Sequence, residues 1–402
     1  MQATPKSLRL HIGIFGRTNV GKSTLINALT NQHVAIISSQ AGTTTDPVEK
    51  SMEMLPIGPV TFIDTAGLDD TTELGQQRVE KTLQVISRCD VAIIVCDNRG
   101  WGQYEVALFE RLQEQKIPTI AVVNKIDIKA ISQKNFAKIK DYCPEPILAS
   151  LEQNRDIVPV LKEQLVRSMP EEFVLNQSII GDLVSEGDTV VLVTPIDKEA
   201  PKGRLILPQV QLIRDLLDNN AKAVVVKVDQ LQSALDNMKE SPKLVVTDSQ
   251  VFDAVSNIVP AHVPLTSFSI LFARHKGDLA AFVNGVQVLN LLPNGANILI
   301  AESCTHHAID DDIARVKIPR WLKEKTGKDL HFDYVVGHDF PKDLKRYNLV
   351  IHCGGCMTNK REILSRIYRA SQQNVAITNY GVVIAFCKNI LDRSIQVFNK
   401  HS

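Results

Sequence analysis

Short apolar runs alternate with amphipathic stretches along the chain, and this rhythm predicts an α/β protein. Near the N-terminus the runs LRLHIGIFG, PVTFID and TIAVVN have the character of strands, and LINAL has helical spacing. From about Ile179 the strand patterns TVVLVTPI, KAVVVKV and KLVVTDS alternate with the helix patterns QVQLIRDLLDNN, QLQSALDNM and QVFDAVSNIV. Such alternation favours parallel sheets whose strands are joined by right-handed helical crossovers.

The last part of the chain repeats this rhythm. NILIAES, HFDYVV and LVIHC are predicted strands, EILSRIYRASQQ is a predicted helix, and VAITNYGVVIAF is predicted to be a strand and a turn. A chain of 402 residues is too long for one core, so several domains are expected. Pro170 closes one helical pattern and a new rhythm begins near Pro264, which predicts domains at 1–170, 178–263 and 264–402.

Charge and cysteine content narrow the possible functions. Lys+Arg and Asp+Glu are both 45, so the balance indicates neither nucleic-acid binding nor adhesion to an anionic membrane. The N-terminus lacks a secretory pattern, and no apolar run approaches the length of a membrane span, so we expect a cytoplasmic protein. Seven cysteines in such a chain favour metal binding or catalysis over disulfides.

The first predicted strand runs into a phosphate-binding loop. Gly16–Ser23 matches G-x-x-x-x-G-K-S and is followed by a helical pattern, which is the context that such a loop requires. Its backbone N–H groups would surround the phosphates, Lys22 would reach the β- and γ-phosphates, and Ser23 would ligate Mg²⁺. Gly21 and Thr24 belong to the same predicted nucleotide site.

Three further motifs follow in the order expected for a GTP-binding protein. In the DTAG motif, Asp64 would hold Mg²⁺ through a water molecule, and the Gly67 N–H group would contact the γ-phosphate. A carboxylate at Asp127 accepts two hydrogen bonds from guanine, and adenine offers no such pair of donors, so GTP is the predicted nucleotide. The remaining predicted guanine contacts are Asn124, Lys125, Ala149 and Ser150.

At these motifs the sequence resembles translation-factor-related GTPases of the Era and MnmE type. Gly42–Asp46 is similar to their G-T-T-R-D switch motif, with Thr45 in place of Arg. The resemblance implies that Thr44 ligates Mg²⁺ and that Asn19 helps to hold K⁺. Leu68 follows DTAG, and an apolar side chain cannot orient water, so slow hydrolysis is expected unless K⁺ or another group compensates. The predicted catalytic residues are Lys22, Thr44, Asp64 and Gly67.

Three cysteines follow predicted strands in the last domain. Cys304 comes after NILIAES, and LVIHC ends in the H-C-x-x-C group that contains Cys353 and Cys356. Ligands gather at the carboxyl ends of parallel strands, so these thiols are expected to converge around Zn²⁺ or an iron–sulfur cluster. A thioredoxin-like redox pair fits poorly, because it needs no distant cysteine. Buried structural roles are predicted for the other cysteines, which are Cys89, Cys96, Cys143 and Cys387.

A GTPase joined to this cysteine motif resembles the [FeFe]-hydrogenase maturation GTPases, the HydF family, over essentially the whole chain. The resemblance implies a P-loop GTPase domain followed by two smaller α/β domains with mainly parallel sheets, the first for dimerisation and the second for cluster binding. It also implies that Cys304, Cys353 and Cys356 hold a [4Fe-4S] cluster. Three thiolates leave one iron without a cysteine, and His306, His352, a nearby carboxylate or an exogenous ligand could be the fourth ligand, with His307 as a bystander.

The same resemblance implies a scaffold that receives a diiron precursor from radical-SAM maturases and delivers it to apo-hydrogenase, most simply as a homodimer. GTP would bias the docking or release of these partners. Two alternatives stay open: an RNA-associated GTPase, which would need a basic face, and a GTPase with a structural zinc site in its last domain.

Overall fold

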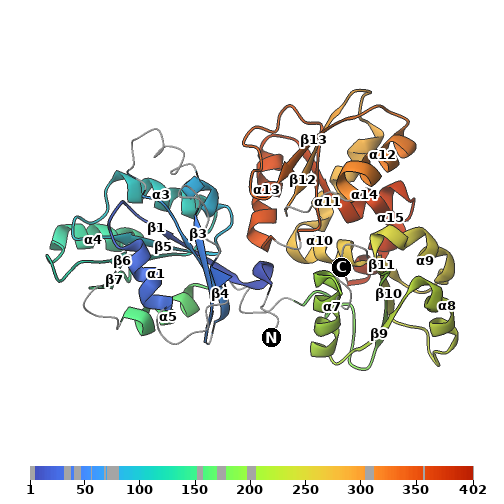
Figure 1. The fold of residues 1–402 in the computed structure, drawn as a ribbon, viewed down its shortest axis with the longest axis horizontal. Helices are drawn as coiled ribbons and strands as arrows, with labels where there is room; N and C mark the ends of the chain where they lie inside the picture. The colour runs from blue at the N-terminus through green and yellow to red at the C-terminus, as the bar shows by residue number, and fades with distance from the viewer. Residues whose placement is uncertain are drawn as a thin grey trace. The chain divides into compact units, whose positions relative to one another are not determined.

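The computed structural model describes residues 5–30, 38–39, 47–55, 57–67, 69, 81–151, 157–169, 178–196, 205–303, 312–355 and 358–401. The chain divides into two compact units, Met1–Asn176 and Gln177–Ser402, each with its own apolar core (Figure 1). Within the described ranges, no helix is long and apolar enough to cross a membrane.

The first unit is built on a sheet whose described strands follow the order β2-β3-β4-β1-β5-β6-β7. β3 pairs antiparallel with β2 and β4, and the remaining pairs are parallel. The strands are β1 (Leu10–Phe15), β2 (Ser38–Ser39), β3 (Val48–Met54), β4 (Gly58–Asp64), β5 (Val91–Cys96), β6 (Thr119–Val123) and β7 (Ile147–Leu148). The helices are η1 (Lys6–Leu8), α1 (Lys22–Thr30), α3 (Gln103–Glu114), α4 (Gln133–Tyr142) and α5 (Ile157–Ser168).

Both faces of this sheet are covered, which explains why its central strands are almost continuously apolar. Every residue of β1 and β5 is buried. Alternate residues of β5 enter two different cores, one containing Val91, Ile93 and Val95, the other Ala92, Ile94 and Cys96. A strand that is buried on both faces has no polar side to alternate with, as is usual in parallel sheets.

The second unit contains two four-stranded parallel sheets, ordered β11-β10-β8-β9 and β13-β12-β14-β15. The strands are β8 (Thr189–Val193), β9 (Lys222–Val226), β10 (Leu244–Thr247), β11 (Leu265–Ser267), β12 (Asn297–Glu302), β13 (His331–Val336), β14 (Leu349–His352) and β15 (Ala376–Asn379). The sequence prediction of two small α/β parts with mainly parallel sheets is therefore confirmed.

Helices connect most of the consecutive strands of both sheets (Figure 1). The described residues 337–348, between β13 and β14, contain no helix. In the part that contains β8 to β11 they are α7 (Leu207–Asp218), α8 (Val228–Asp236), η2 (Ser249–Val251), α9 (Phe252–Ile258) and α10 (Phe268–Lys276). The following helices are α11 (Leu279–Gln287), η3 (Val288–Asn290), the π-helical turn η4 (Ile313–Lys317), α12 (Ile318–Thr326), α13 (Lys360–Gln372), α14 (Tyr380–Cys387), α15 (Leu391–Ile395) and η5 (Gln396–His401).

The structure corrects the predicted boundary between residues 263 and 264. β11 pairs with β10, with Val245 opposite Leu265, so the first sheet of this unit extends to Ser267. The two sheets also share one apolar cluster, which contains Val245 of β10 and Ile300 of β12. The boundary is predicted where the α/β pattern begins again near Pro264, whereas the chain there forms a short edge strand of the preceding sheet.

The structure also corrects the strand and turn predicted for VAITNYGVVIAF. The strand β15 is present, but the helix α14 follows it directly. The Asn379 side chain accepts a hydrogen bond from the Val382 N–H and caps this helix. Five consecutive residues, 381–385, are buried, so the helix has no polar face and its apolar run shows no helical period.

Candidate functional site

The phosphate loop lies between β1 and α1, as predicted. Its backbone takes positive φ angles at Gly16 (146°), Asn19 (61°) and Gly21 (104°). A Cβ at Gly21 would come within 2.2 Å of the Asn124 Nδ2 atom, so only glycine fits there. Thr24 lies in the first turn of α1, which begins at Lys22. The loop and the helix N-terminus together offer the backbone N–H groups that bind phosphate in such folds.

Two of the three residues expected to hold Mg²⁺, Ser23 and Asp64, contact each other. The Ser23 hydroxyl donates a hydrogen bond to Asp64 Oδ2 at 2.7 Å. The other carboxylate oxygen, Asp64 Oδ1, is buried and has no hydrogen-bond partner among the described residues. An unpaired buried carboxylate oxygen beside a hydroxyl fits a hydrated Mg²⁺, whose ligands are oxygen atoms and water.

Lys22 and a second carboxylate complete this end of the site. The Lys22 amine donates to the carbonyls of Gly16 (3.0 Å) and Arg17 (2.8 Å). Burial lowers the pKa of Lys22, while Asp64 and Asp69 act in the opposite direction. The Asp69 carboxylate accepts hydrogen bonds from the Thr18 N–H (2.7 Å) and hydroxyl (2.8 Å). Partial burial raises the pKa of Asp69, but these hydrogen bonds outweigh it and lower the pKa overall.

The predicted guanine contacts lie at the ends of β6 and β7. Asn124 donates from Nδ2 to the Val20 carbonyl (2.9 Å) and accepts from the Leu151 N–H (3.1 Å). It therefore ties the phosphate loop to the segment that contains Ala149 and Ser150. Lys125 has a positive φ of 61°, and Asp127 is exposed, so its carboxylate is accessible to a base.

Some predicted residues of the nucleotide site lie outside the described part of the chain. These are Leu68 and the switch motif Gly42–Asp46, which includes Thr44 and Thr45. Gly67 is described, and an added Cβ there would meet the Thr18 hydroxyl at 2.1 Å, so it lies directly against the phosphate loop.

Sequence reasoning missed one buried ion pair that supports the phosphate loop. The Arg17 guanidinium donates to Glu105 Oε1 at 2.6 Å and to the Gly100 carbonyl at 2.6 Å. The Glu105 side chain is fully buried and also accepts from the Gly102 N–H, which caps α3. Arg17 occupies a variable position of the loop motif, and Glu105 lies in an ordinary helical pattern. The sequence therefore gives no indication that these two residues form a pair.

In the second unit, Cys353 follows β14 directly and sits beside the end of β12. The pairing of Ala301 with His352 brings these two strand ends together. Cys353 Sγ accepts a hydrogen bond from the Ser303 N–H (3.1 Å) and lies 3.1 Å from the Ser303 hydroxyl. Ser303 immediately precedes Cys304 in the sequence. The two strand ends that lead to the predicted ligands are therefore adjacent.

The loop after Cys353 is held by a buried lysine that sequence reasoning missed. Gly355 has a φ of 62°, and a Cβ there would approach the Ile363 Cδ1 atom to 2.6 Å. The Lys276 amine, at the end of α10, donates to the carbonyls of Gly355 (3.0 Å) and Thr358 (3.3 Å). Only 3% of Lys276 is exposed, so its charge lies inside the protein beside the cysteine loop.

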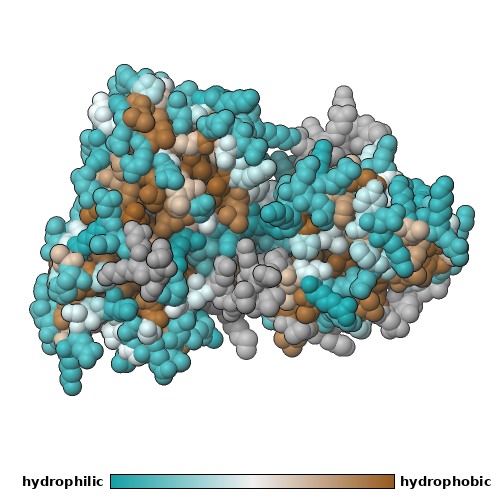
Figure 2. All heavy atoms as spheres, turned by 180° about the vertical axis from the view of Figure 1, so that it is seen from behind, coloured by the Kyte–Doolittle hydropathy of each residue, from teal (hydrophilic) through white to brown (hydrophobic). Residues whose placement is uncertain are grey.

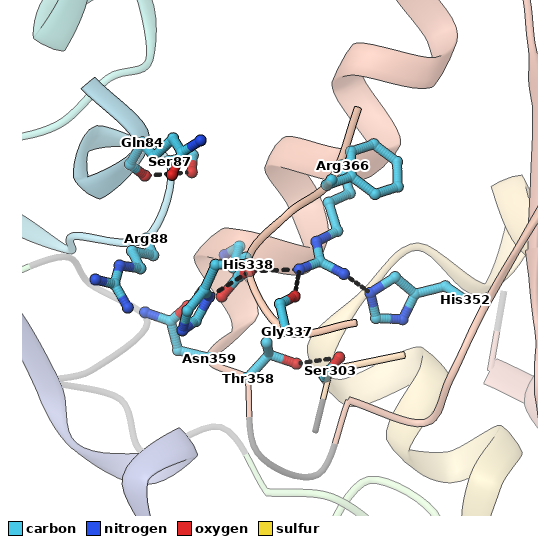
Figure 3. Close-up of polar contacts among 12 residues, drawn as sticks. Gln84, Ser87, Arg88, Ser303, Gly337, His338, His352, Thr358, Asn359 and Arg366 are labelled. Carbon is cyan, nitrogen blue, oxygen red and sulfur yellow. Dashed lines mark hydrogen bonds and ion pairs between the residues drawn. The ribbon is translucent and has the colours of Figure 1, made fainter. Parts of the chain in front are cut away.

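His352 takes part in a buried polar network, which Figure 3 shows. Its Nδ1 lies 2.6 Å from the Cys353 carbonyl. Its Nε2 lies 3.0 Å from the Arg366 guanidinium, and Figure 3 marks this contact. Arg366 also donates to the carbonyl of Gly337 and to Glu362, both at 2.6 Å. Arginine has no acceptor, so Nε2 must accept and Nδ1 must carry the proton. Burial, followed by the charge of Arg366, lowers the pKa of His352 to about 3.

The other predicted ligands, Cys304, Cys356 and His306, lie outside the described residues, as does the predicted bystander His307. Among the residues that the structure does describe, no three His, Cys, Asp or Glu side chains form a metal-binding group. Cys89, Cys96 and Cys143 are buried and Cys387 is half-buried, none in a disulfide. Burial raises the pKa of Cys96, Cys143 and Cys387 to about 12, which makes these thiols unreactive.

Comparisons with known proteins agree with this division of the chain. Residues 11–125 match the family described as 50S ribosome-binding GTPase. Residues 179–277 match the hydrogen maturase F dimerization domain, and residues 280–397 match the hydrogen maturase F tetramerization domain. The match to the dimerization domain ends at residue 277, just after α10. This supports a boundary that lies after β11 and not before it.

The similar curated proteins include tRNA modification GTPases. MnmE of Chromobacterium violaceum is 35% identical over 173 residues, which are 41% of this chain and 37% of that protein. MnmE of Caldicellulosiruptor saccharolyticus is 30% identical over 244 residues, 59% of this chain and 48% of that protein. The chain thus spans less than half the length of either relative. Among solved structures, Era of Aquifex aeolicus covers 54% of this chain and 93% of its own, with 22% identity and a TM-score of 0.33.

The first unit is therefore a P-loop GTPase domain, joined to two domains that occur in hydrogenase maturation proteins. The chain belongs to the hydrogen maturase F family.

Proposed function

We propose that this chain is a scaffold for hydrogenase maturation that binds a [4Fe-4S] cluster, holds a diiron precursor and delivers it to apo-hydrogenase. GTP hydrolysis in the first unit regulates this work. The observation that carries the proposal is the placement of Cys353 beside Ser303, the residue before Cys304, in a chain with hydrogen maturase F domains.

The nucleotide half of the proposal assigns one role to each predicted residue. Lys22 neutralises charge on the β- and γ-phosphates, while Ser23 and Thr44 ligate Mg²⁺ and Asp64 holds it through water. Gly67 meets the γ-phosphate through its N–H group. The guanine base contacts Asn124, Lys125, Asp127, Ala149 and Ser150, and Asp127 makes the choice of guanine.

We further propose that hydrolysis is slow and depends on K⁺ held by Asn19. Leu68 cannot orient the attacking water, so another positive charge beside the phosphates must stabilise the transition state. The test is GTP turnover in KCl and in NaCl, with Asn19→Ala as the variant. Turnover should be faster in KCl, and the variant should lose that difference. Equal rates in both salts for the unmodified protein would remove the potassium hypothesis.

The cluster half of the proposal rests on the donor set at the ends of β12 and β14. Cysteine thiolates are the usual ligands of iron–sulfur clusters, and Cys353 already accepts an N–H hydrogen bond of the kind that stabilises a thiolate. The group fits these residues, with Cys304, Cys353 and Cys356 as its proposed ligands. When bound, the cluster supplies an iron without a cysteine ligand, where another metal fragment can dock.

We favour His306 over His352 as a protein ligand to that iron. Both ring nitrogens of His352 have protein partners, the Cys353 carbonyl and Arg366, and iron binding would require one contact to break. We assign His352 instead to positioning, because its ring holds the Cys353 backbone in place. A weak or exchangeable ligand at the fourth iron would leave room for the diiron precursor, which is the cargo in this proposal.

The partners follow from this cargo: radical-SAM maturases that supply the precursor and apo-hydrogenase that receives it. GTP binding would order the switch segments and so change which partner surface is favoured. The dimerization and tetramerization domains make the working form an oligomer of this chain.

The proposal is tested by anaerobic reconstitution with iron and sulfide, followed by metal analysis and visible absorption. The variants are Cys353→Ser and, as a matched control, Cys387→Ser, with circular dichroism to check folding. The unmodified protein and the control should turn brown and hold about four irons per chain, while folded Cys353→Ser should lose colour and most of its iron. A colourless protein that retains zinc instead would replace the scaffold with a GTPase that has a structural metal.

A further inference from the structure

Tyr380 is the next residue after β15, at the same sheet edge as Cys353. In the parallel pairing of β14 with β15, His352 stands opposite Asn379. Cys353 and Tyr380 are the residues that follow this pair. The segments after β14 and β15 therefore leave the sheet side by side, about 4.8 Å apart in the hydrogen-bonding direction. Tyr380 then begins α14, capped by Asn379.

The Tyr380 hydroxyl is buried and lacks a hydrogen-bond partner within the described residues. Buried tyrosines usually satisfy this group, as Tyr347 does by donating to Asp333 at 2.8 Å. An unpaired buried hydroxyl destabilises a fold by about 1–3 kcal/mol, so such a group calls for an explanation, and an absent ligand is one.

The surroundings show what kind of ligand that would be. Burial is the main cause of a raised pKa for the Tyr380 hydroxyl. The negative charges of Cys353, Glu302 and Asp312, in decreasing order of effect, raise this pKa further. Both carboxylates have other partners: Glu302 pairs with Arg315 at 2.7 Å, and Asp312 accepts from the Arg315 N–H at 2.7 Å. The hydroxyl stays protonated at ordinary pH, so it remains a donor beside the cysteine.

We propose that Tyr380 is a positioning residue whose hydroxyl donates a hydrogen bond to a sulfur atom of the cluster held by Cys353. This inference rests on the proposed function, because it requires a cluster. A hydrogen bond to sulfur is stronger when the cluster carries more negative charge, so it favours the reduced state and raises the reduction potential. The same bond satisfies the orphaned hydroxyl.

The test compares Tyr380→Phe with Tyr347→Phe in two measurements. In the reconstituted protein, Tyr380→Phe should lower the reduction potential of the cluster, measured by titration of the EPR signal of the reduced form. The expected change is about 59 mV for one electron, which is about tenfold in the reduction equilibrium constant. In the metal-free protein, the same substitution should leave the unfolding midpoint unchanged or raise it, because no hydrogen bond to a described residue is lost. Tyr347→Phe should leave the potential unchanged and lower the unfolding midpoint, because it removes a hydroxyl that is paired with Asp333.

The outcomes separate this inference from the function on which it rests. An unmodified protein that binds no cluster overturns both. A cluster whose potential is the same in Tyr380→Phe overturns the role of Tyr380 and leaves the proposed function standing. A folded but markedly destabilised metal-free Tyr380→Phe also overturns it, because the hydroxyl would then have a structural partner.

Discussion

At the scale of single residues, two buried lysines perform similar tasks in the two units. Lys22 donates to two carbonyls of the phosphate loop, and Lys276 donates to two carbonyls around the cysteine loop. Each brings a positive charge to a loop expected to hold an anionic group, nucleotide phosphate in one unit and a thiolate-bound cluster in the other. The charge and the carbonyl contacts together hold these loops open for their ligands.

Replacing Lys276 by Met should destabilise the second unit. The carbonyls of Gly355 and Thr358 would lose a charged donor, which lowers the free energy of unfolding by about 1–3 kcal/mol. Chemical denaturation of the metal-free protein measures this loss. Lys328→Met is the control, because Lys328 is only half-buried and donates to the Asn290 carbonyl at the surface. Equal stability of the two variants would contradict the role given to Lys276.

Replacing Asp69 by Asn should strengthen GTP binding. The Asp69 carboxylate bonds to Thr18 of the phosphate loop and acts on the charge of Lys22, so it opposes the arrival of the γ-phosphate. Removing one such negative charge is worth about 1 kcal/mol at a partly exposed site, or roughly fivefold in affinity. Titration with a non-hydrolysable GTP analogue and with GDP measures the effect, which should be larger for the analogue. Exposed Asp141→Asn serves as control, and weaker binding by Asp69→Asn would refute the expectation.

At the scale of elements, the strand ends of both units are where the sequence is most informative. Glycine loops, DTAG and the H-C-x-x-C group each follow an apolar run, so both their chemistry and their position at a sheet edge could be predicted. Contacts made across the fold could not be predicted, since Lys276 ends an apolar helix 77 positions before Cys353 in the sequence and Arg366 lies on an ordinary amphipathic helix. The helix α14 was missed because burial on all sides removes its period.

His275 on the helix α10 should make the stability of the second unit depend on pH. Burial, followed by the charges of Lys276, Lys360 and Arg274, lowers the pKa of His275 from 6.5 to about 4. Between these two values the unfolded chain binds a proton that the folded chain does not, so stability falls as the pH decreases through this window. His275→Gln should show a smaller decrease between pH 7 and 4.5, and exposed His331→Gln should behave as the unmodified protein. Parallel curves for all three would show that His275 does not contribute.

At the scale of the whole molecule, the second unit has the surface expected of a protein that self-associates. Figure 2 shows hydrophobic residues among hydrophilic ones on the face that it presents. β9 is an edge strand whose Val225 is 42% exposed, and strand edges pair readily with other chains. Val225→Lys should therefore reduce the molar mass measured by light scattering. Val210→Lys on α7, where the valine is also 42% exposed, should not, and an unchanged mass for Val225→Lys would remove β9 from the interface.

In the proposed function, the cysteine site of this GTPase carries a metal cargo to hydrogenase. The most direct measurement is hydrogen evolution by apo-hydrogenase after incubation with this protein, reconstituted with iron and sulfide and loaded by its maturases. The unmodified protein and Cys387→Ser should activate the hydrogenase, and folded Cys353→Ser should not. Equal activation by Cys353→Ser, or none by the unmodified protein after verified loading, would contradict the account.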